Sequence, residues 1–151
     1  MNLDTKSFNL TRTMPVTVDQ LWHLLTDAKA REKWSGPDAT TLLETETADL
    51  RVGGRDQHRF GPADAPEFVV DTRWYDLTAP VRAVFTETLI FSGAAVCTSL
   101  VTYVLQSNGN HTELQTTVAV TSFSGSDTLD EVHTGWNGGM DNLERHAATI
   151  A

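Results

Sequence analysis

The sequence predicts an α+β fold in which one curved antiparallel sheet wraps around a long C-terminal helix. Three observations predict it. A helix-start signal at residues 16–21 follows a short alternating stretch near the N-terminus. Between residues 40 and 121 the apolar residues recur with a period of two, which is typical of strands. After residue 124 their spacing changes to three and four, which indicates a long amphipathic helix.

A short first strand is expected over residues 7–13. Its residues alternate in character, and Phe8, Leu10 and Arg12 fall on one face. Pro15 ends the strand because proline has no backbone N–H to donate to a neighbouring strand.

Two helices are expected next. Thr17 and Gln20 have the spacing of a capping box, which starts a helix that runs to about residue 27. A second helical turn is expected over Lys29 to Trp34, and it stops at Gly36–Pro37 because proline cannot extend it.

Six strands then follow, separated by turns rich in glycine, proline or asparagine. We expect them at residues 41–48, 55–60, 67–75, 82–91, 96–106 and 112–121. The links are too short for parallel crossovers, so the strands form an antiparallel meander. Gly53–Gly54 is interpreted as a tight turn. The inward residues of the last strand are expected to be Leu114, Thr116, Val118 and Val120.

The final helix is expected to span about 20 residues, with Ser124 or Ser126 as its cap. Its apolar positions are Leu129, Val132, Trp136, Met140 and Leu143. Gly135, Gly138 and Gly139 lie inside it, and each destabilises a helix by up to about 1 kcal/mol relative to alanine. They therefore indicate either a close backbone approach or a bend. A helix lying in a concave sheet leaves a gap, which we expect to be a cavity.

The composition of the chain limits the classes of partner that are expected. The 151 residues fit one domain, 1–151, with a formal charge of −9 and a pI of about 4.8. This charge argues against nucleic acid and anionic membrane surfaces as partners. Cys97 is the single cysteine, so we expect no disulfide. There is no signal-peptide pattern and no apolar run of about 18 residues, so a cytoplasmic location is expected.

No motif for covalent chemistry stands out. We find no nucleophile elbow, P-loop or dinucleotide fingerprint. The five histidines have no paired spacing, so neither a metal nor a cofactor is expected. Cys97 is interpreted as an inert buried thiol. The acidic residues Asp127, Asp130 and Glu131 are interpreted as a solvated face that favours the positive end of the helix dipole.

A set of short features in a fixed order carries a resemblance to a known family. They are Arg12, Pro15, Val18–Trp22, Leu25–Asp27, Trp34, Gly36–Pro37, Asp49–Arg51, Gly53–Gly54, Pro80, Val101–Thr102, Leu105, Gly135–Trp136 and Leu143. From about residue 8 to 147 the chain resembles the activator of heat-shock protein 90 ATPase homologue family, in the START-like (SRPBCC) helix-grip superfamily. The resemblance implies a helix-grip fold, β-α-α-β-β-β-β-β-β-α, with an internal hydrophobic pocket.

The chain departs from this family at Asp56 and His58, where relatives usually carry apolar residues. Two positions apart on a strand, both point to the same side. Glu87 shares a face with Phe85 and Leu89 on another strand. If both faces point inward, Asp56, His58 and Glu87 form a polar patch that anchors a ligand or serves as a general base. If the strand is slipped by one residue, all three are solvated.

The leading functional hypothesis is the binding of a small apolar, aromatic or polyketide-like molecule in the cavity, without covalent catalysis. The expected lining comprises Trp22, Leu25, Trp34, His58, Phe60, Trp74, Phe85, Glu87, Tyr103, Val118, Val132, Trp136 and Met140. Whether the chain is an enzyme stays open. The alternatives are a polyketide cyclase-like enzyme that uses His58, a chaperone-regulating interaction module, and an antibiotic self-resistance protein. The chain is expected to be a monomer or a weak homodimer.

Overall fold

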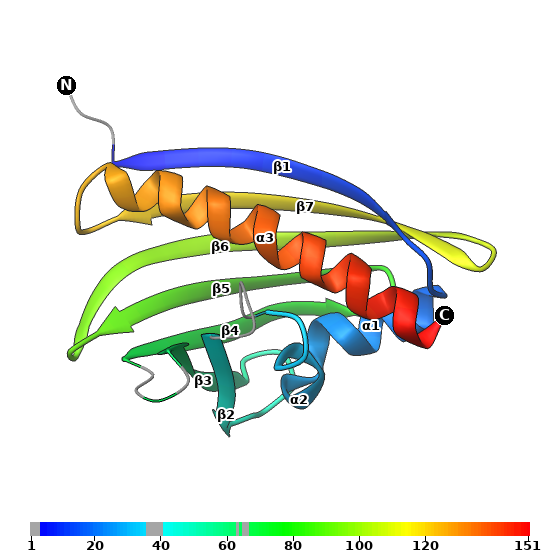
Figure 1. Ribbon diagram of the computed structural model, residues 1–151, viewed down its shortest axis with the longest axis horizontal. Helices are drawn as coiled ribbons and strands as arrows, with labels where there is room; N and C mark the ends of the chain where they lie inside the picture. The colour runs from blue at the N-terminus through cyan, green and yellow to red at the C-terminus, as the bar shows by residue number, and fades with distance from the viewer. Residues whose placement is uncertain (1–3, 36–40, 63, 65–66) are drawn as a thin grey trace.

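A computed structural model describes residues 4–35, 41–62, 64 and 67–151. These residues form one seven-stranded antiparallel sheet, in the order β1-β7-β6-β5-β4-β3-β2, and three helices (Figure 1). The strands are β1 (Thr5–Met14), β2 (Thr41–Thr47), β3 (Arg55–Pro62), β4 (Phe68–Thr78), β5 (Arg82–Phe91), β6 (Ala94–Asn108) and β7 (His111–Ser122). The predicted α+β fold with a curved antiparallel sheet and a C-terminal helix is confirmed.

The first helix, α1 (Val18–Thr26), begins where the capping box predicts. The Thr17 backbone N–H donates to Gln20 Oε1 at 2.9 Å, and the Gln20 N–H donates to Thr17 Oγ1 at 3.3 Å. The two side chains thereby satisfy N–H groups that a helix start leaves unpaired.

The second helix, α2 (Ala28–Arg31), is shorter than the expected stretch from Lys29 to Trp34. Asp27 caps it by accepting the Ala30 N–H at 2.9 Å. Beyond Arg31 the backbone bonds tighten, because the Trp34 N–H donates to the Arg31 carbonyl three residues back. The expected stop at Gly36–Pro37 lies outside the described residues.

The third helix, α3 (Asp127–Ile150), lies across the concave side of the sheet (Figure 1). Ser126 occupies the cap position, although its side chain makes no capping hydrogen bond. Ser124 Oγ instead lies 2.7 Å from Thr128 Oγ1. The predicted apolar positions face inward as expected: Leu129, Met140 and Leu143 are buried, and Val132 and Trp136 pack against the core.

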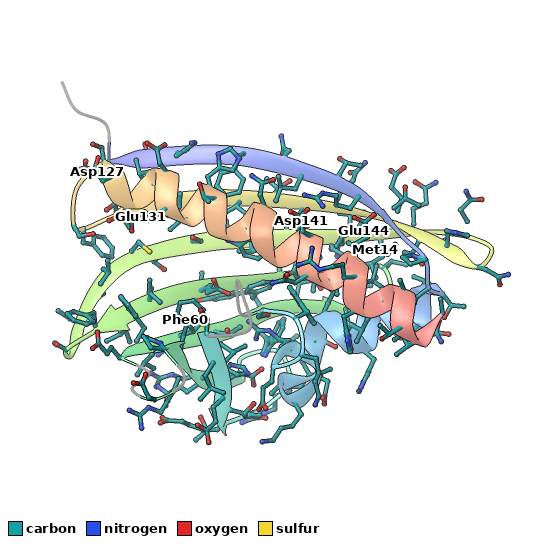
Figure 2. The ribbon with its side chains drawn as sticks, in the orientation of Figure 1. Met14, Phe60, Asp127, Glu131, Asp141 and Glu144 are labelled. Carbon is teal, nitrogen blue, oxygen red and sulfur yellow. The ribbon has the colours of Figure 1, made fainter. Side chains whose placement is uncertain are left out.

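The core runs beneath α3 from Leu129 near its start to Ala147 near its end. It includes residues of α1 and of the C-terminal half of α3, and Leu21, Leu25, Met140 and Leu143 are at most 1% exposed. Met14, the last residue of β1, belongs to the same core (Figure 2). The contacts of α3 with the sheet are mainly with β1 and β7. The sheet therefore curves away from the N-terminal half of α3 toward β2.

The turn before β3 is as tight as Gly53–Gly54 predicts. Gly53 has a φ of +83°, and a Cβ on Gly54 would lie 2.0 Å from the Asp49 carbonyl oxygen. The Gly53 N–H donates to the Trp74 carbonyl at 2.8 Å, which fixes the turn against β4. Within the described chain, no helix has both the length and the apolar character needed to cross a bilayer.

Candidate functional site

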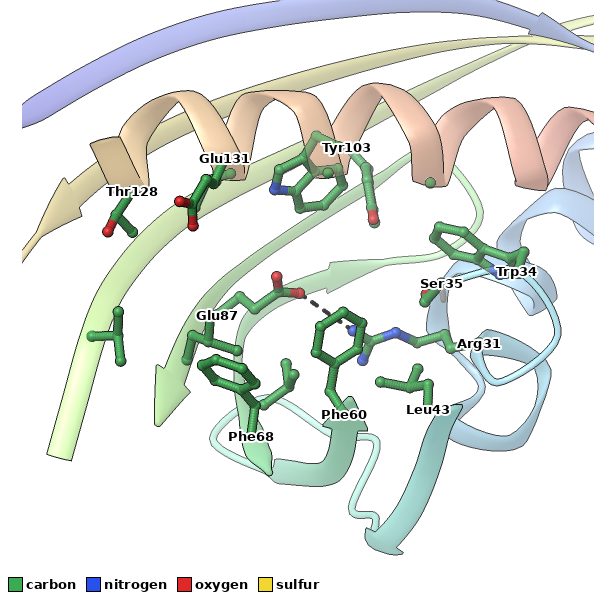
Figure 3. Close-up of a pocket in the computed structure, with 17 residues that line it drawn as sticks. Arg31, Trp34, Ser35, Leu43, Phe60, Phe68, Glu87, Tyr103, Thr128 and Glu131 are labelled. Carbon is green, nitrogen blue, oxygen red and sulfur yellow. Dashed lines mark ion pairs between the residues drawn. The ribbon is translucent and has the colours of Figure 1, made fainter. Parts of the chain in front are cut away.

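A cavity of about 360 Å³ lies between the N-terminal half of α3 and the sheet (Figure 3). It is partly open to solvent and mostly apolar. The described lining residues are Arg31, Trp34, Ser35, Leu43, Phe60, Phe68, Val70, Glu87, Leu89, Val96, Tyr103, Thr128, Glu131, Val132, Gly135, Trp136 and Gly139. They come from α2 and the turn after it, five strands and α3, so the cavity lies where the sheet curves away from the helix.

The roof of the cavity is one face of α3. Its lining residues recur every three or four positions from Thr128 to Gly139, which places them on a single stripe of the helix. A Cβ built on Gly135 or Gly139 meets no atom within 4 Å. The expectation that these glycines mark a close backbone approach is therefore wrong. Gly135 and Gly139 instead leave empty space where a side chain would project into the cavity.

The floor is apolar and comes from alternating positions of neighbouring strands. Phe60 on β3, Phe68 on β4 and Leu89 on β5 all line it. Phe60 and Phe68 are in edge contact, with ring centroids 6.4 Å apart. An aromatic series also runs from core to roof, because Phe85 contacts Tyr103 and Tyr103 contacts Trp136 at centroid distances of 5.2 and 6.3 Å. The cavity is thus a continuation of the core in which the packing is incomplete.

One end of the cavity contains a buried cluster of charges around Arg31. The Arg31 side chain is 6% exposed. Its Nη2 lies 3.5 Å from Glu87 Oε2, its Nη1 lies 3.9 Å from Asp56 Oδ2, and Nη1 donates to Thr72 Oγ1 at 3.4 Å. One guanidinium therefore faces two carboxylates, and Glu87 is the carboxylate that also lines the cavity.

The environment shifts the ionisation of the two acidic groups that line this region. Burial raises the pKa of the Glu87 carboxyl above its ordinary value, and the positive charge of Arg31 opposes this only in part. Burial also raises the pKa of the Tyr103 phenol, so this hydroxyl keeps its proton. No hydrogen bond of the Tyr103 hydroxyl is found among the described residues. This hydroxyl points into the cavity (Figure 3), where it is free to bond to a ligand.

Asp56 and His58 face inward as predicted, and both are 0% exposed. The alternative of a slipped strand is therefore wrong. Neither residue lines the cavity, however. Asp56 has a structural role, because its carboxylate accepts the Asp49 backbone N–H at 2.8 Å and the Trp74 indole N–H at 3.3 Å.

His58 makes no described hydrogen bond or ion pair with the other two members of the expected patch, Asp56 and Glu87. Its Nε2 lies 3.1 Å from the Ala28 carbonyl and donates to it, which leaves Nδ1 as an acceptor without a partner among the described residues. Burial lowers the pKa of the imidazole, and the charge of Arg31 lowers it further. Asp56, His58 and Glu87 therefore do not converge on a substrate position, because Arg31 lies between Asp56 and Glu87.

The structure divides the expected lining residues into two groups. Trp34, Phe60, Glu87, Tyr103, Val132 and Trp136 line the cavity. Trp22, Leu25, His58, Trp74, Phe85, Val118 and Met140 do not. Leu25, Trp74, Phe85, Val118 and Met140 belong to the packed core, and Trp22 packs against it. The sequence predicts which face of each strand or helix points inward. It does not predict which end of the inward face of the sheet is covered by packed side chains, because that depends on where α1 lies.

Sequence reasoning missed four polar residues of the lining: Arg31, Ser35, Thr128 and Glu131. Arg31 lies in a polar run, yet it is three residues from both Ala28 and Trp34, which share its helical face. Glu131 and Thr128 lie on the α3 face that carries Val132 and Trp136. Glu131 was expected to be part of a solvated face, and it is exposed as well as lining the cavity. Helical spacing was a signal for two of them, because Arg31 is three residues from Trp34 and Thr128 is four residues from Val132.

Two other chemical possibilities have little support in the described chain. No three His, Cys, Asp or Glu side chains gather there at a spacing suited to a metal ion. Cys97 is buried, and burial raises the pKa of its thiol to about 11, which disfavours the nucleophilic thiolate.

Comparison with known proteins confirms the resemblance seen in the sequence. The model of the family described as "Activator of Hsp90 ATPase homolog 1-like protein" matches residues 15–148. Among curated proteins, no sequence matches the chain significantly.

Solved structures similar to this chain share its fold. Protein Mll3558 from Rhizobium loti is 27% identical, with a TM-score of 0.78 over 93% of this chain and 96% of that one. An uncharacterised protein from Rhizobium leguminosarum is 17% identical, with a TM-score of 0.81 over 96% and 95%. CalU16 from Micromonospora echinospora is 24% identical, with a TM-score of 0.64 over 95% and 76%.

Proposed function

The chain belongs to the activator of Hsp90 ATPase homolog 1-like family, and on that basis we propose that it binds a small apolar molecule in the cavity beneath α3. The observation that carries this proposal is the mostly apolar cavity itself, whose α3 wall includes Gly135 and Gly139. Protein interiors are normally close-packed, so an apolar cavity of this size beside the core is unusual. Two glycines on one face, each destabilising to the helix, favour a cavity that a ligand fills.

The size and chemistry of the cavity support the same proposal. A volume of about 360 Å³ lies at the lower end of the range typical of small-molecule sites. Such sites are mainly apolar and aromatic, with a few polar groups that orient the ligand. Here Arg31, Glu87 and Tyr103 are among the polar groups of the lining.

We propose binding without covalent catalysis. A general base must reach the proton that it removes, directly or through one water. His58 lies outside the lining and donates its only described hydrogen bond to a backbone carbonyl. The cyclase-like alternative therefore has no imidazole at the cavity wall.

The family description supports a second candidate, an interaction with a chaperone ATPase. Purified chaperone of the Hsp90 class, assayed for ATP hydrolysis with and without this chain, tests it. Stimulation that persists when the cavity is blocked would support this candidate as an activity independent of ligand binding.

The experiment for ligand binding uses N-phenyl-1-naphthylamine, an uncharged dye whose fluorescence rises in apolar sites. We expect saturable binding to the wild-type chain. Gly135→Leu places a side chain in the cavity and should abolish this binding. Gly138→Leu is the matched control, because Gly138 is outside the lining and a Cβ there meets no atom within 4 Å.

Both substitutions replace glycine by a better helix former, so thermal unfolding should show that both variants fold. Absence of dye binding to the wild-type chain, or equal binding by Gly135→Leu and wild type, would contradict the proposal.

A further inference from the structure

The cavity carries an excess of negative charge. Three of its described lining residues are charged: Glu87, Glu131 and Arg31. Arg31 is also paired with Asp56, which is 0% exposed. The three charged lining residues carry a formal charge of −1 when all are ionised, and Asp56 behind Arg31 adds a further −1. Any ligand in this cavity therefore experiences a field that favours positive charge.

The two lining carboxylates come from opposite walls. Glu131 extends from α3 and Glu87 from β5, and both point into the same space (Figure 3). Glu87 is paired with Arg31, whereas Glu131 has no ion-pair partner among the described residues. Two acids farther along α3, Asp141 and Glu144 (labelled in Figure 2), do have a partner, because they lie 2.6 and 3.8 Å from Arg12 of β1. Glu131 is thus an unneutralised carboxylate at the cavity wall.

Aromatic rings provide a second, independent preference for positive charge. The cavity is lined by the rings of Trp34, Phe60, Phe68, Tyr103 and Trp136. The faces of such rings carry negative potential, and rings grouped around a cavity are the usual means of binding an ammonium group. A hydrated anion gains nothing from these faces.

Arg31 does not make the cavity an anion site. Its Nη1 approaches Asp56 and Thr72, and its Nη2 approaches Glu87. A ligand carboxylate would have to displace Glu87 from the guanidinium and would then lie beside it. Two carboxylates that share one site repel each other strongly.

We propose that the ligand of this cavity is an amphiphilic amine, whose protonated nitrogen lies between Glu87 and Glu131 while its apolar body lies against the aromatic rings. This inference rests on the proposed function, because it specifies the chemical class of the ligand. The raised pKa of Glu87 is compatible with it, since an ammonium close to Glu87 would favour the ionised carboxylate and offset the effect of burial. The excess of acidic residues over the whole chain also concentrates cations near the opening.

The test uses three probes with one ring system and different head groups: 2-naphthylmethylamine, 2-naphthylmethanol and 2-naphthoic acid. Their affinities for the wild-type chain are measured at neutral pH by displacement of N-phenyl-1-naphthylamine and by calorimetry. We expect the amine to bind about tenfold more tightly than the alcohol, as expected for an ammonium in a partly open site among rings and carboxylates. The acid should bind most weakly, and added salt should reduce the preference.

Two variants test whether Glu87 and Glu131 cause the preference for the amine. Glu131→Gln, at an exposed helix position, should reduce the preference for the amine, and the double variant Glu87→Gln/Glu131→Gln should abolish it. Glu44→Gln is the matched control, because it removes the same charge from an exposed position of β2 outside the lining. Binding of the alcohol should be similar in all variants.

The outcomes separate the two proposals. If the dye binds but the amine binds no more tightly than the alcohol, the inference is overturned and the proposed function stands. A preference that survives the double variant, or that Glu44→Gln removes equally, also overturns it. If neither the dye nor any naphthyl probe binds, the proposed function fails and the inference fails with it.

Discussion

Arg31 on α2 and Glu87 on β5 form an ion pair across the end of the cavity, with Nη2 3.5 Å from Oε2. The pair joins the short helix to the middle of the sheet. Arg31 also lies 3.9 Å from the buried carboxylate of Asp56, which anchors the turn before β3. The guanidinium therefore connects α2, β3 and β5, and its loss would leave two carboxylates without a counter-charge.

Arg31→Met tests this connection. Removing one partner of a buried ion pair leaves an uncompensated charge, which usually lowers the free energy of unfolding by about 3–5 kcal/mol. We expect a loss near the lower end, because Glu87 can be protonated and its side chain retains 27% exposure. Urea denaturation at neutral pH measures it.

Lys6→Met serves as the comparison for Arg31→Met. Lys6 pairs with Asp130 at the surface, where the two side chains are 32% and 82% exposed. Such a pair contributes at most about 1 kcal/mol. Equal losses in the two variants would show that the Arg31 cluster is no more important than a surface pair.

The titration of Glu87 makes stability depend on pH. Its pKa is raised in the folded chain, so the folded state binds its proton more tightly than the unfolded state. As pH rises from the ordinary value of about 4.5 through the raised value, the wild type loses this contribution to stability. Glu87→Gln cannot titrate. The stability of the variant relative to wild type should therefore increase with pH in this window and then level off, as denaturation at a series of pH values will show.

The fold was predictable because its signals are local. The capping box of Thr17 and Gln20 and the alternation in β7 each depend on residues close in sequence. The cavity was less predictable, because it depends on which end of the concavity α1 fills. Phe85 and Glu87 lie on the same inward face of β5, yet Phe85 is in the packed core and Glu87 lines the cavity. Local periodicity gives both residues the same orientation and cannot separate them.

His58 should produce the opposite dependence on pH. Burial lowers the pKa of its imidazole, so the unfolded state binds this proton more tightly. The wild type should lose stability as pH falls below about 6.5 and on toward the lowered value. His58→Gln retains a donor for the Ala28 carbonyl and cannot become an imidazolium, so it should lose less. Parallel stability curves for wild type and His58→Gln between pH 7 and 5 would contradict this assignment.

The start of α1 depends on the capping box. Thr17→Ala removes the oxygen that accepts the Gln20 N–H and should lower the free energy of unfolding by about 1 kcal/mol. Thr17→Asp keeps an acceptor at the same place and should retain most of the stability. Urea denaturation of both variants measures the difference, and a Thr17→Asp variant as unstable as Thr17→Ala would show that the capping bond is not the cause.

Alanine substitutions at Gly135 and Gly138 should show that the stability of α3 and the binding of a ligand can change independently. Alanine at position 135 or 138 meets no atom within 4 Å, so each substitution should stabilise the helix by up to about 1 kcal/mol. Their effects on ligand binding should differ, because Gly135 lines the cavity and Gly138 does not. Gly135→Ala should therefore raise the melting temperature and weaken binding of N-phenyl-1-naphthylamine, whereas Gly138→Ala should raise the melting temperature alone. If Gly135→Ala binds the dye as tightly as Gly138→Ala does, the space under Gly135 is not part of the binding site, and the glycine needs another explanation.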